Sequence, residues 1–203
     1  MKKQVVVISG GDTFATYKEY LNFLRNYKID IDRYKSDKTD WKPWLRQVLG
    51  ESYEVILPKM PNVTNARFEE WKLCFEKFIP FLNSGVVLVG HSLGGSFLAK
   101  YLSKNQFPKK IEAVFLVAAC FGDNLPEYKA VDFHISNDIN KLSIQARNIF
   151  LYHSKDDPVV PFADLIKFKE KLPIAQIRIF DDGGHFIQEE FPELVEDILN
   201  LDN

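Results

Sequence analysis

Short apolar runs separated by helical patterns recur along the chain, and this alternation constrains the fold more than any other feature. The runs are rich in valine, isoleucine and phenylalanine, and several are apolar at every position, which is typical of strands buried on both faces of a parallel sheet. They occupy residues 5–9, 53–57, 86–89, 113–118, 148–153 and 176–180. Strands that alternate with helices predict an α/β fold with right-handed crossover connections.

The domain organisation follows from the length of the chain and from its longest connection. A chain of 203 residues without a low-complexity linker predicts a single domain over residues 1–203. The connection between the first two runs holds two helical patterns, so we expect a helical insertion over about residues 13–52. Loops at the carboxyl ends of parallel strands surround the ligand crevice. Two interpretations stay open: residues 13–34, with Tyr17 and Tyr20 on one face, overhang the site as a lid, or they pack against the flank of the sheet.

Composition and charge narrow the class of partner. The formal net charge is −2 and no long run of like charge occurs, which disfavours nucleic acid and anionic membranes as partners. The apolar run after the first two lysines is too short for a signal peptide, and no stretch is long enough to cross a bilayer. Cys74 and Cys120 lie in apolar surroundings, which favours buried free thiols over a disulfide. We therefore predict a cytoplasmic protein that acts on a small molecule.

The stretch VGHSLGGS places Ser92 between Gly90 and Gly94, after an apolar run and before an amphipathic helical pattern. A nucleophilic serine at such a strand-to-helix turn has a strained backbone, and the residues two positions before and after it must be small because they crowd together. The helix that follows would direct the Leu93 N–H at a developing oxyanion. The G-x-S-x-G pattern also occurs by chance, so Ser92 as nucleophile requires a base, an acid and a second oxyanion donor.

His185 is the best candidate for the base among the four histidines. Two glycines precede it, and it lies between the last apolar run and the last helical pattern, where a loop can bring it close to other backbone. His91 lies within the turn and would point away from Ser92. His134 lies in a polar segment without an evident partner, and His153 ends a buried run, which favours a packed or hydrogen-bonded core histidine.

The stretch FLYHSKDDPVVPF offers two candidates for the acid, Asp156 and Asp157, at the carboxyl end of an apolar run. The proline that follows them stops a helix there, so both lie in a loop. We choose Asp157, directly before PVVP, as the acid that would hold the imidazole tautomer and stabilise the imidazolium. Asp156 is then a surface or turn residue. Asp181 and Asp182 are too near His185 in sequence to be preferred.

The second oxyanion donor is expected in the loop after the first apolar run, ISGGDTF. Glycines in this loop allow backbone N–H groups to approach a ligand closely. We choose Gly11, with Asp12 as the next candidate, and a plain tight turn is the alternative. The order along the chain is then Ser92, Asp157, His185. The sequence has no cluster of metal-ligating residues, no G-x-G-x-x-G and no phosphate-binding loop, so we expect neither a metal nor a cofactor.

The motifs GHSLGG, KDDPVVP and GGHF resemble the three catalytic motifs of the α/β-hydrolase superfamily, and the resemblance extends over nearly the whole chain. The short polar segment at residues 121–147 leaves little room for a large cap, and in this the chain is similar to the compact YdeN-like serine hydrolases, relatives of a retinoblastoma-binding protein. The resemblance implies a three-layer α/β/α sandwich with a six-stranded parallel sheet of order 2-1-3-4-5-6, and hydrolysis without a cofactor. Ser92, Asp157 and His185 match the triad positions. The loop after the first run departs from the pattern, with Ser-Gly where many members carry His-Gly.

The leading hypothesis is therefore a carboxylesterase-like serine hydrolase that cleaves an ester, thioester or amide through an acyl-enzyme. A non-catalytic binding protein on the same fold is the main alternative, since a fold does not imply a function. Acyl transfer to an acceptor other than water is a third hypothesis. An intact Ser-His-Asp triad would be needless in a pure scaffold, which favours the hydrolase.

Overall fold

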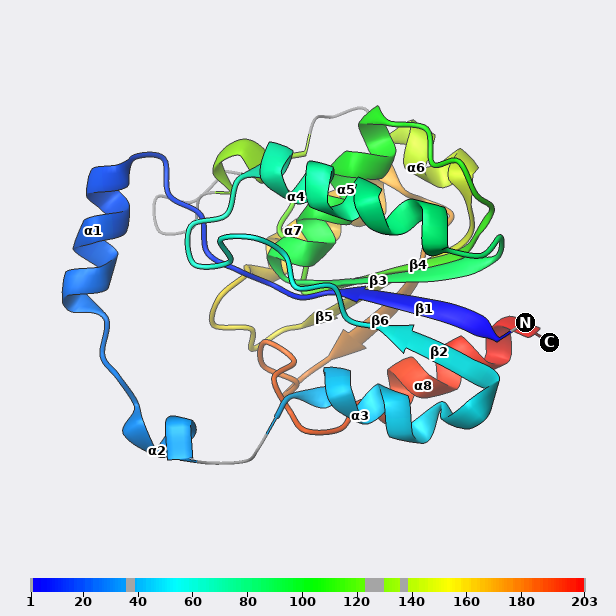
Figure 1. Ribbon diagram of the computed structural model, residues 1–203, viewed down its shortest axis with the longest axis horizontal. Helices are drawn as coiled ribbons and strands as arrows, with labels where there is room; N and C mark the ends of the chain where they lie inside the picture. Colours follow the sequence, from blue (N-terminus) through cyan, green and yellow to red (C-terminus); the bar gives the residue numbers. More distant parts are fainter. Residues whose placement is uncertain (1, 36–38, 123–129, 136–138, 203) are drawn as a thin grey trace.

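A parallel sheet of six strands forms the centre of the structure, a computed structural model that describes residues 2–35, 39–122, 130–135 and 139–202 (Figure 1). The strand order in these residues is β2-β1-β3-β4-β5-β6, which confirms the order expected from the resemblance. Each strand overlaps the apolar run that predicted it. The strands are β1 (Lys3–Ile8), β2 (Tyr53–Ile56), β3 (Val86–His91), β4 (Ile111–Val117), β5 (Ala146–Ser154) and β6 (Gln176–Phe180).

The register of the central strands brings their carboxyl ends to one edge of the sheet. Ile8 of β1 lies opposite Gly90 of β3, which in turn lies opposite Leu116 of β4. Every residue of β3 is buried, as its uninterrupted apolar run predicts, whereas β6 at the margin of the sheet exposes Gln176, Arg178 and Ile179. The loops that leave β1, β3 and β5 therefore meet at the same edge, where the candidate site residues lie.

Helices cover both faces of the sheet, so the fold is the predicted three-layer α/β/α sandwich (Figure 1). Apolar side chains of the helices and of the sheet form one core on each face, because every covering helix turns an apolar stripe inward. One face carries α4 (Phe68–Phe78), α5 (Leu93–Lys104), α6 (Asn140–Gln145) and α7 (Phe162–Lys171), and the other carries α3 (Trp41–Val48) and α8 (Pro192–Leu199). Short 3-10 helices occur at η1 (Gly50–Ser52), η2 (Ile79–Phe81), η3 (Val131–Phe133) and η4 (Asn200–Asp202).

The helical insertion divides into a packed part and an exposed part. Its last helix, α3, packs on the sheet through Trp41 and Leu45, which are both 0% exposed. In contrast, α1 (Tyr17–Asn26) and α2 (Ile31–Lys35) stand away from the sheet (Figure 1), and no residue of α1 is buried. The interpretation in which the Tyr17 face packs against the flank of the sheet is therefore wrong. We call residues 12–40, which include both exposed helices, the arm.

Three other expectations concern segments outside the sheet. The segment at residues 121–147, where we expected little room for a cap, includes residues 123–129 and 136–138, which lie outside the described residues. Both cysteines are free thiols, as predicted, although only Cys120 is fully buried and Cys74 is partly exposed. In the part of the chain that the structure describes, no helix has both the length and the apolar character needed to cross a membrane.

Candidate active site

Ser92 occupies the sharp turn between β3 and α5 and has a strained backbone. Its φ of 56° and ψ of −126° lie in a region that a residue with a side chain rarely adopts. Such a conformation costs on the order of 1–3 kcal/mol and persists only where the surroundings enforce it. Here the Ser92 N–H donates to the Val117 carbonyl at 2.8 Å, and the Ser92 carbonyl accepts from the Gly95 N–H at 2.9 Å. The turn has the geometry predicted for a nucleophile elbow.

The glycines around Ser92 are required by close backbone packing. A Cβ atom on Gly94 would lie 2.2 Å from the Ile8 carbonyl oxygen, and one on Gly90 would lie 2.6 Å from the Gly94 carbonyl oxygen. A Cβ atom on Gly95 would lie 2.7 Å from the Ala119 side chain. These distances are too short for any methyl group, so β1, β3 and α5 can approach each other only with glycine at these positions. The small residues expected at the elbow therefore have a steric cause.

The structure brings the three predicted triad residues into one hydrogen-bonded line. His185 Nε2 lies 2.9 Å from Ser92 Oγ, and His185 Nδ1 lies 2.9 Å and 3.0 Å from the two carboxylate oxygens of Asp157. A carboxylate can only accept, so the imidazole proton is on Nδ1 and Nε2 is free to accept from the serine hydroxyl. This is the arrangement that a serine needs for activation by a general base.

Asp157 is held in place by the turn that follows β5. Its side chain is 0% exposed, and its Oδ1 atom accepts hydrogen bonds from the N–H groups of Val159 at 2.8 Å and Val160 at 3.0 Å. His153 stabilises the same turn, because its Nε2–H donates to the Val160 carbonyl at 2.9 Å. Burial lowers the pKa of His153. His153 is thus the hydrogen-bonded core histidine that the sequence predicts, and it orders the turn that carries Asp157.

Asp156 has a role in the site that the sequence did not indicate. It is exposed, as predicted, but its Oδ1 atom accepts from the Gly184 N–H at 2.8 Å and from the Ser154 hydroxyl. Ser154 Oγ in turn accepts from the Gly183 N–H at 2.8 Å. The hydrogen bond from Ser154 is the main cause that lowers the pKa of Asp156. Asp156 therefore ties the end of β5 to the glycines directly before His185.

Two buried side chains hold the other side of the His185 loop, and the sequence did not indicate them either. His91 Nε2–H donates to the His185 carbonyl at 2.8 Å. Trp41, at the start of α3, donates from Nε1–H to the Phe186 carbonyl at 2.8 Å and from its backbone N–H to the Gln188 carbonyl at 2.8 Å. This loop is itself strained, since Phe186 has a φ of 52°.

The surroundings keep His91 neutral. Burial is the main cause that lowers its pKa well below the usual value, and the positive charge of the nearby Lys42 acts in the same direction. A neutral imidazole with its proton on Nε2 can donate to the His185 carbonyl without adding positive charge beside the His185 ring, whose centroid is 5.0 Å away. His91 and Asp156 adjoin Ser92 and Asp157 in sequence, which could have drawn attention to them.

The loop after β1 packs directly against Ser92. A Cβ atom on Gly10 would lie 2.9 Å from Ser92 Cβ, and one on Gly11 would lie 2.5 Å from the Val63 carbonyl oxygen. The alternative oxyanion donor, Asp12, is already engaged, because its N–H donates to the Val63 carbonyl at 2.7 Å. Gly11 therefore stays the better candidate of the two, and its role as a donor stays a prediction.

Leu93 is the first residue of α5, so its N–H has no acceptor within the helix. The Leu93 N–H is therefore available as the oxyanion donor that the sequence predicts.

The other acidic and histidine residues that the sequence analysis considered lie away from Ser92. The Asp181 carboxylate pairs with Lys155 at 2.7 Å on the surface, and Asp182 is exposed. His134 is exposed and bonds through Nδ1 to the Val131 carbonyl at 2.6 Å. In the described part of the chain, no group of three or more histidine, cysteine or acidic side chains could hold a metal ion.

Comparison with known proteins agrees with this geometry. Residues 33–196 match a family described as "Serine hydrolase". YdeN of Bacillus subtilis (strain 168), described as a hydrolase, is 29% identical over 164 residues, which cover 79% of this chain and 85% of YdeN. The crystal structure of the B. subtilis ydeN gene product superposes with a TM-score of 0.77 at 22% identity, over 99% of each chain. A YdeN-like hydrolase from Pectobacterium atrosepticum gives a TM-score of 0.65 at 15% identity, over 99% of this chain and 91% of that one. The likeness of these structures shows the fold, which is that of the α/β-hydrolases.

Proposed function

The chain belongs to the serine hydrolase family, and we propose that it cleaves carboxylic esters, or related thioesters or amides, through an acyl-enzyme on Ser92. One observation carries this proposal: the unbroken line of hydrogen bonds from Ser92 Oγ through His185 to the buried Asp157 carboxylate. These hydrogen bonds join residues from three separate loops, and a polar network with a purely structural role would not require a serine, a histidine and a buried carboxylate in this order.

In the proposed first step, His185 Nε2 takes the hydroxyl proton as Ser92 Oγ attacks the carbonyl carbon. A C–O bond forms, and the carbonyl electron pair moves to the oxygen. Collapse of this intermediate breaks the bond to the alcohol, which leaves with the proton from Nε2. Water then attacks the acyl-enzyme by the same route, and the acid is released. Asp157 orients the ring and stabilises the imidazolium without accepting the proton.

The N–H groups of Leu93 and Gly11 are the proposed oxyanion donors. Leu93 begins a helix of 12 residues, and the positive end of the helix dipole favours negative charge at that point. Gly11 follows Gly10, where an added Cβ atom would lie 3.3 Å from Ser92 Oγ, so the loop after β1 borders the reacting oxygen.

The strain at Ser92 also supports catalysis over a binding role. A non-catalytic protein would have no reason to maintain a serine at a φ of 56° beside a histidine that is oriented by a buried carboxylate. We further propose that the protein is cytoplasmic, and the two free cysteines support this location.

Labelling with a fluorophosphonate probe tests the proposal. The wild-type protein should be labelled and should hydrolyse p-nitrophenyl acetate in the presence of EDTA, since the mechanism uses no metal ion. Ser92→Ala should lose both properties while keeping its fold by circular dichroism. Equal labelling of the two proteins would exclude Ser92 as the nucleophile, and labelling of neither would favour the binding-protein alternative.

A further inference from the structure

A row of aromatic side chains in the arm packs on itself instead of on the core. The ring of Phe14 lies 5.6 Å from Tyr20 and 5.0 Å from Phe23, and Phe23 lies 5.5 Å from Tyr27. We call these four residues the aromatic row. None of the four rings belongs to either core of the described structure; Phe14, Tyr20 and Phe23 are half-buried, and Tyr27 is 47% exposed. The row is therefore a partly exposed apolar surface outside the cores.

The N-terminal end of the arm is hydrogen-bonded to the loop between β2 and α4, and this loop packs on the candidate oxyanion loop. The Phe14 carbonyl accepts from Arg67 Nη1 at 2.7 Å, and Thr13 Oγ1 donates to the Ala66 carbonyl at 2.9 Å. The same loop, between β2 and α4, contributes the Val63 carbonyl that lies against Gly11. The row therefore begins within a few residues of the backbone that borders Ser92.

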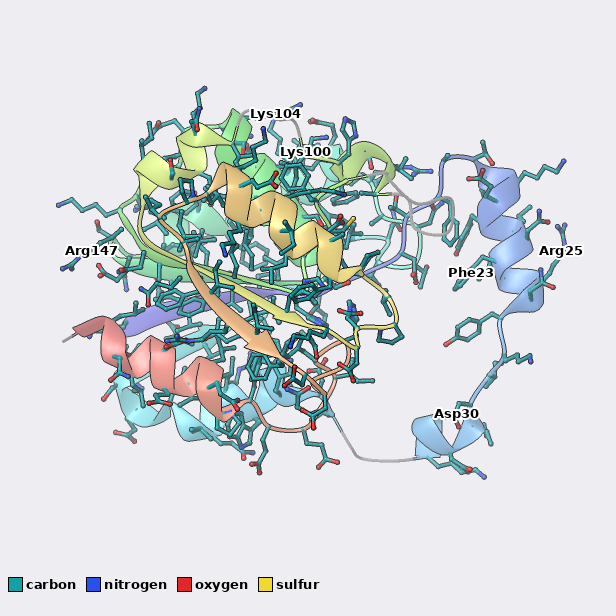
Figure 2. The ribbon with its side chains drawn as sticks, turned by 180° about the vertical axis from the view of Figure 1, so that it is seen from behind. Phe23, Arg25, Asp30, Lys100, Lys104 and Arg147 are labelled. Atoms are coloured by element: carbon teal, nitrogen blue, oxygen red, sulfur yellow. The ribbon has the colours of Figure 1, made fainter. Side chains whose placement is uncertain are left out.

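The residue directly after the arm is hydrogen-bonded to the loop of the candidate base. Trp41 directly follows the arm, and its two N–H groups donate to the carbonyls of Phe186 and Gln188, next to His185. The arm thus connects the two sides of the site, and α1 lies off the edge of the sheet where the strands end (Figure 1). Seen from behind, Phe23 extends from α1 toward the body of the molecule, whereas Arg25 extends away from it (Figure 2).

We propose that the aromatic row binds the acyl group of the substrate, and that the preferred substrates are esters of long-chain or aromatic carboxylic acids. This inference rests on the proposed function. The occupant follows from continuity: the row starts beside the oxyanion loop and leads away from it, which is the path of an acyl chain whose carbonyl carbon is at Ser92. The arm would then determine specificity, while the sheet carries the reactive groups.

A series of p-nitrophenyl esters from acetate to octanoate tests the inference. The double variant Phe23→Ala with Tyr27→Ala removes two rings of the row, and Arg25→Ala on the opposite side of α1 is the matched control. Each methylene that loses its apolar contact lowers kcat/KM by roughly fourfold at most, so the ratio of octanoate to acetate hydrolysis should fall by about tenfold or more. The control Arg25→Ala should leave the hydrolysis of both esters unchanged. Phe23→Leu with Tyr27→Leu should restore most of the octanoate activity.

The outcomes separate this inference from the proposed function. An unchanged octanoate-to-acetate ratio in a double variant that still hydrolyses acetate overturns the role of the row and leaves the hydrolase intact. A wild-type protein that hydrolyses no ester and is not labelled by a fluorophosphonate overturns both proposals. Light scattering gives the oligomeric state. If the double variant dissociates from a dimer to a monomer with no change in the ratio, the row is a self-association surface and the inference is wrong.

Discussion

The turn around Ser92 and the arm lie at the same edge of the sheet, yet their environments are opposite. Every residue of β3 and every residue from 92 to 103 is buried, whereas no residue of α1 is. The glycines of the elbow approach neighbouring backbone so closely that an added methyl group would lie as little as 2.2 Å from it. The aromatic side chains of α1 contact one another and Phe14, and the Tyr20 hydroxyl lies 3.4 Å from the Thr64 hydroxyl in the loop before α4.

This contrast shows two ways of placing residues beside a site. Ser92 is positioned by the close packing of β1, β3 and α5, so its hydroxyl has one location. The aromatic row is positioned by the bond between the Phe14 carbonyl and Arg67, in the loop before α4, and by contacts among its own rings. Reactive groups need close packing on all sides, because small displacements of these groups lower the reaction rate. A surface that accepts varied acyl chains can tolerate the looser attachment of the arm.

The largest effect of a substitution on kcat is expected within the buried site itself. Asp157→Asn should lower kcat for p-nitrophenyl acetate by about 10⁴-fold, because the asparagine favours the wrong imidazole tautomer, as the equivalent change does in a serine protease. Asp156→Asn is the matched control one residue away. Its amide oxygen can still accept from the Gly184 N–H, so kcat should fall far less. If Asp156→Asn were the more damaging of the two, the assignment of the acid would be reversed.

An intermediate effect is expected at Trp41, where the arm joins the site. Trp41→Phe keeps an aromatic ring but leaves the Phe186 carbonyl without its donor, which should cost about 1–3 kcal/mol in the free energy of unfolding. The loosened His185 loop should also lower kcat more than it raises KM. Urea denaturation and steady-state kinetics measure the two effects.

Trp44→Phe is the control for Trp41, because it makes the same change in the same helix at a partly exposed position that lines a groove against α8. It should leave kcat unchanged. An equal loss of kcat in both variants would mean that α3 acts only through general stability.

The smallest effect is expected on the arm. Tyr17 is 67% exposed, so Tyr17→Ala should change the free energy of unfolding by no more than about 0.5 kcal/mol in urea denaturation. Truncation of a buried aromatic residue costs about 3–5 kcal/mol instead. A loss of that size would show that Tyr17 packs on the body of the protein in solution, and the contrast between the two regions would disappear.

Local patterns of residues were enough to predict the strands and the elbow, whereas the strand order was expected from the resemblance to the α/β-hydrolases. Uninterrupted apolar runs such as VVLV at residues 86–89 indicate strands buried on both faces, and the glycines beside Ser92 reflect a steric demand that acts over a few residues. The three triad candidates were also chosen from local motifs. The structure brings them within hydrogen-bonding distance because parallel strands end at one edge.

The contacts that hold the His185 loop could be found only in the folded chain. Trp41 and Phe186 are 145 residues apart, and nothing in the sequence around either residue indicates the other. Asp156 was predicted to be a surface or turn residue, and such a prediction does not identify the Gly184 N–H, 28 residues away, as its hydrogen-bond donor. The arm was equally ambiguous, because an amphipathic pattern predicts a helix with an apolar face but not the surface that face meets. Periodicity acts within one element, whereas the partner of an element depends on how distant segments are brought together.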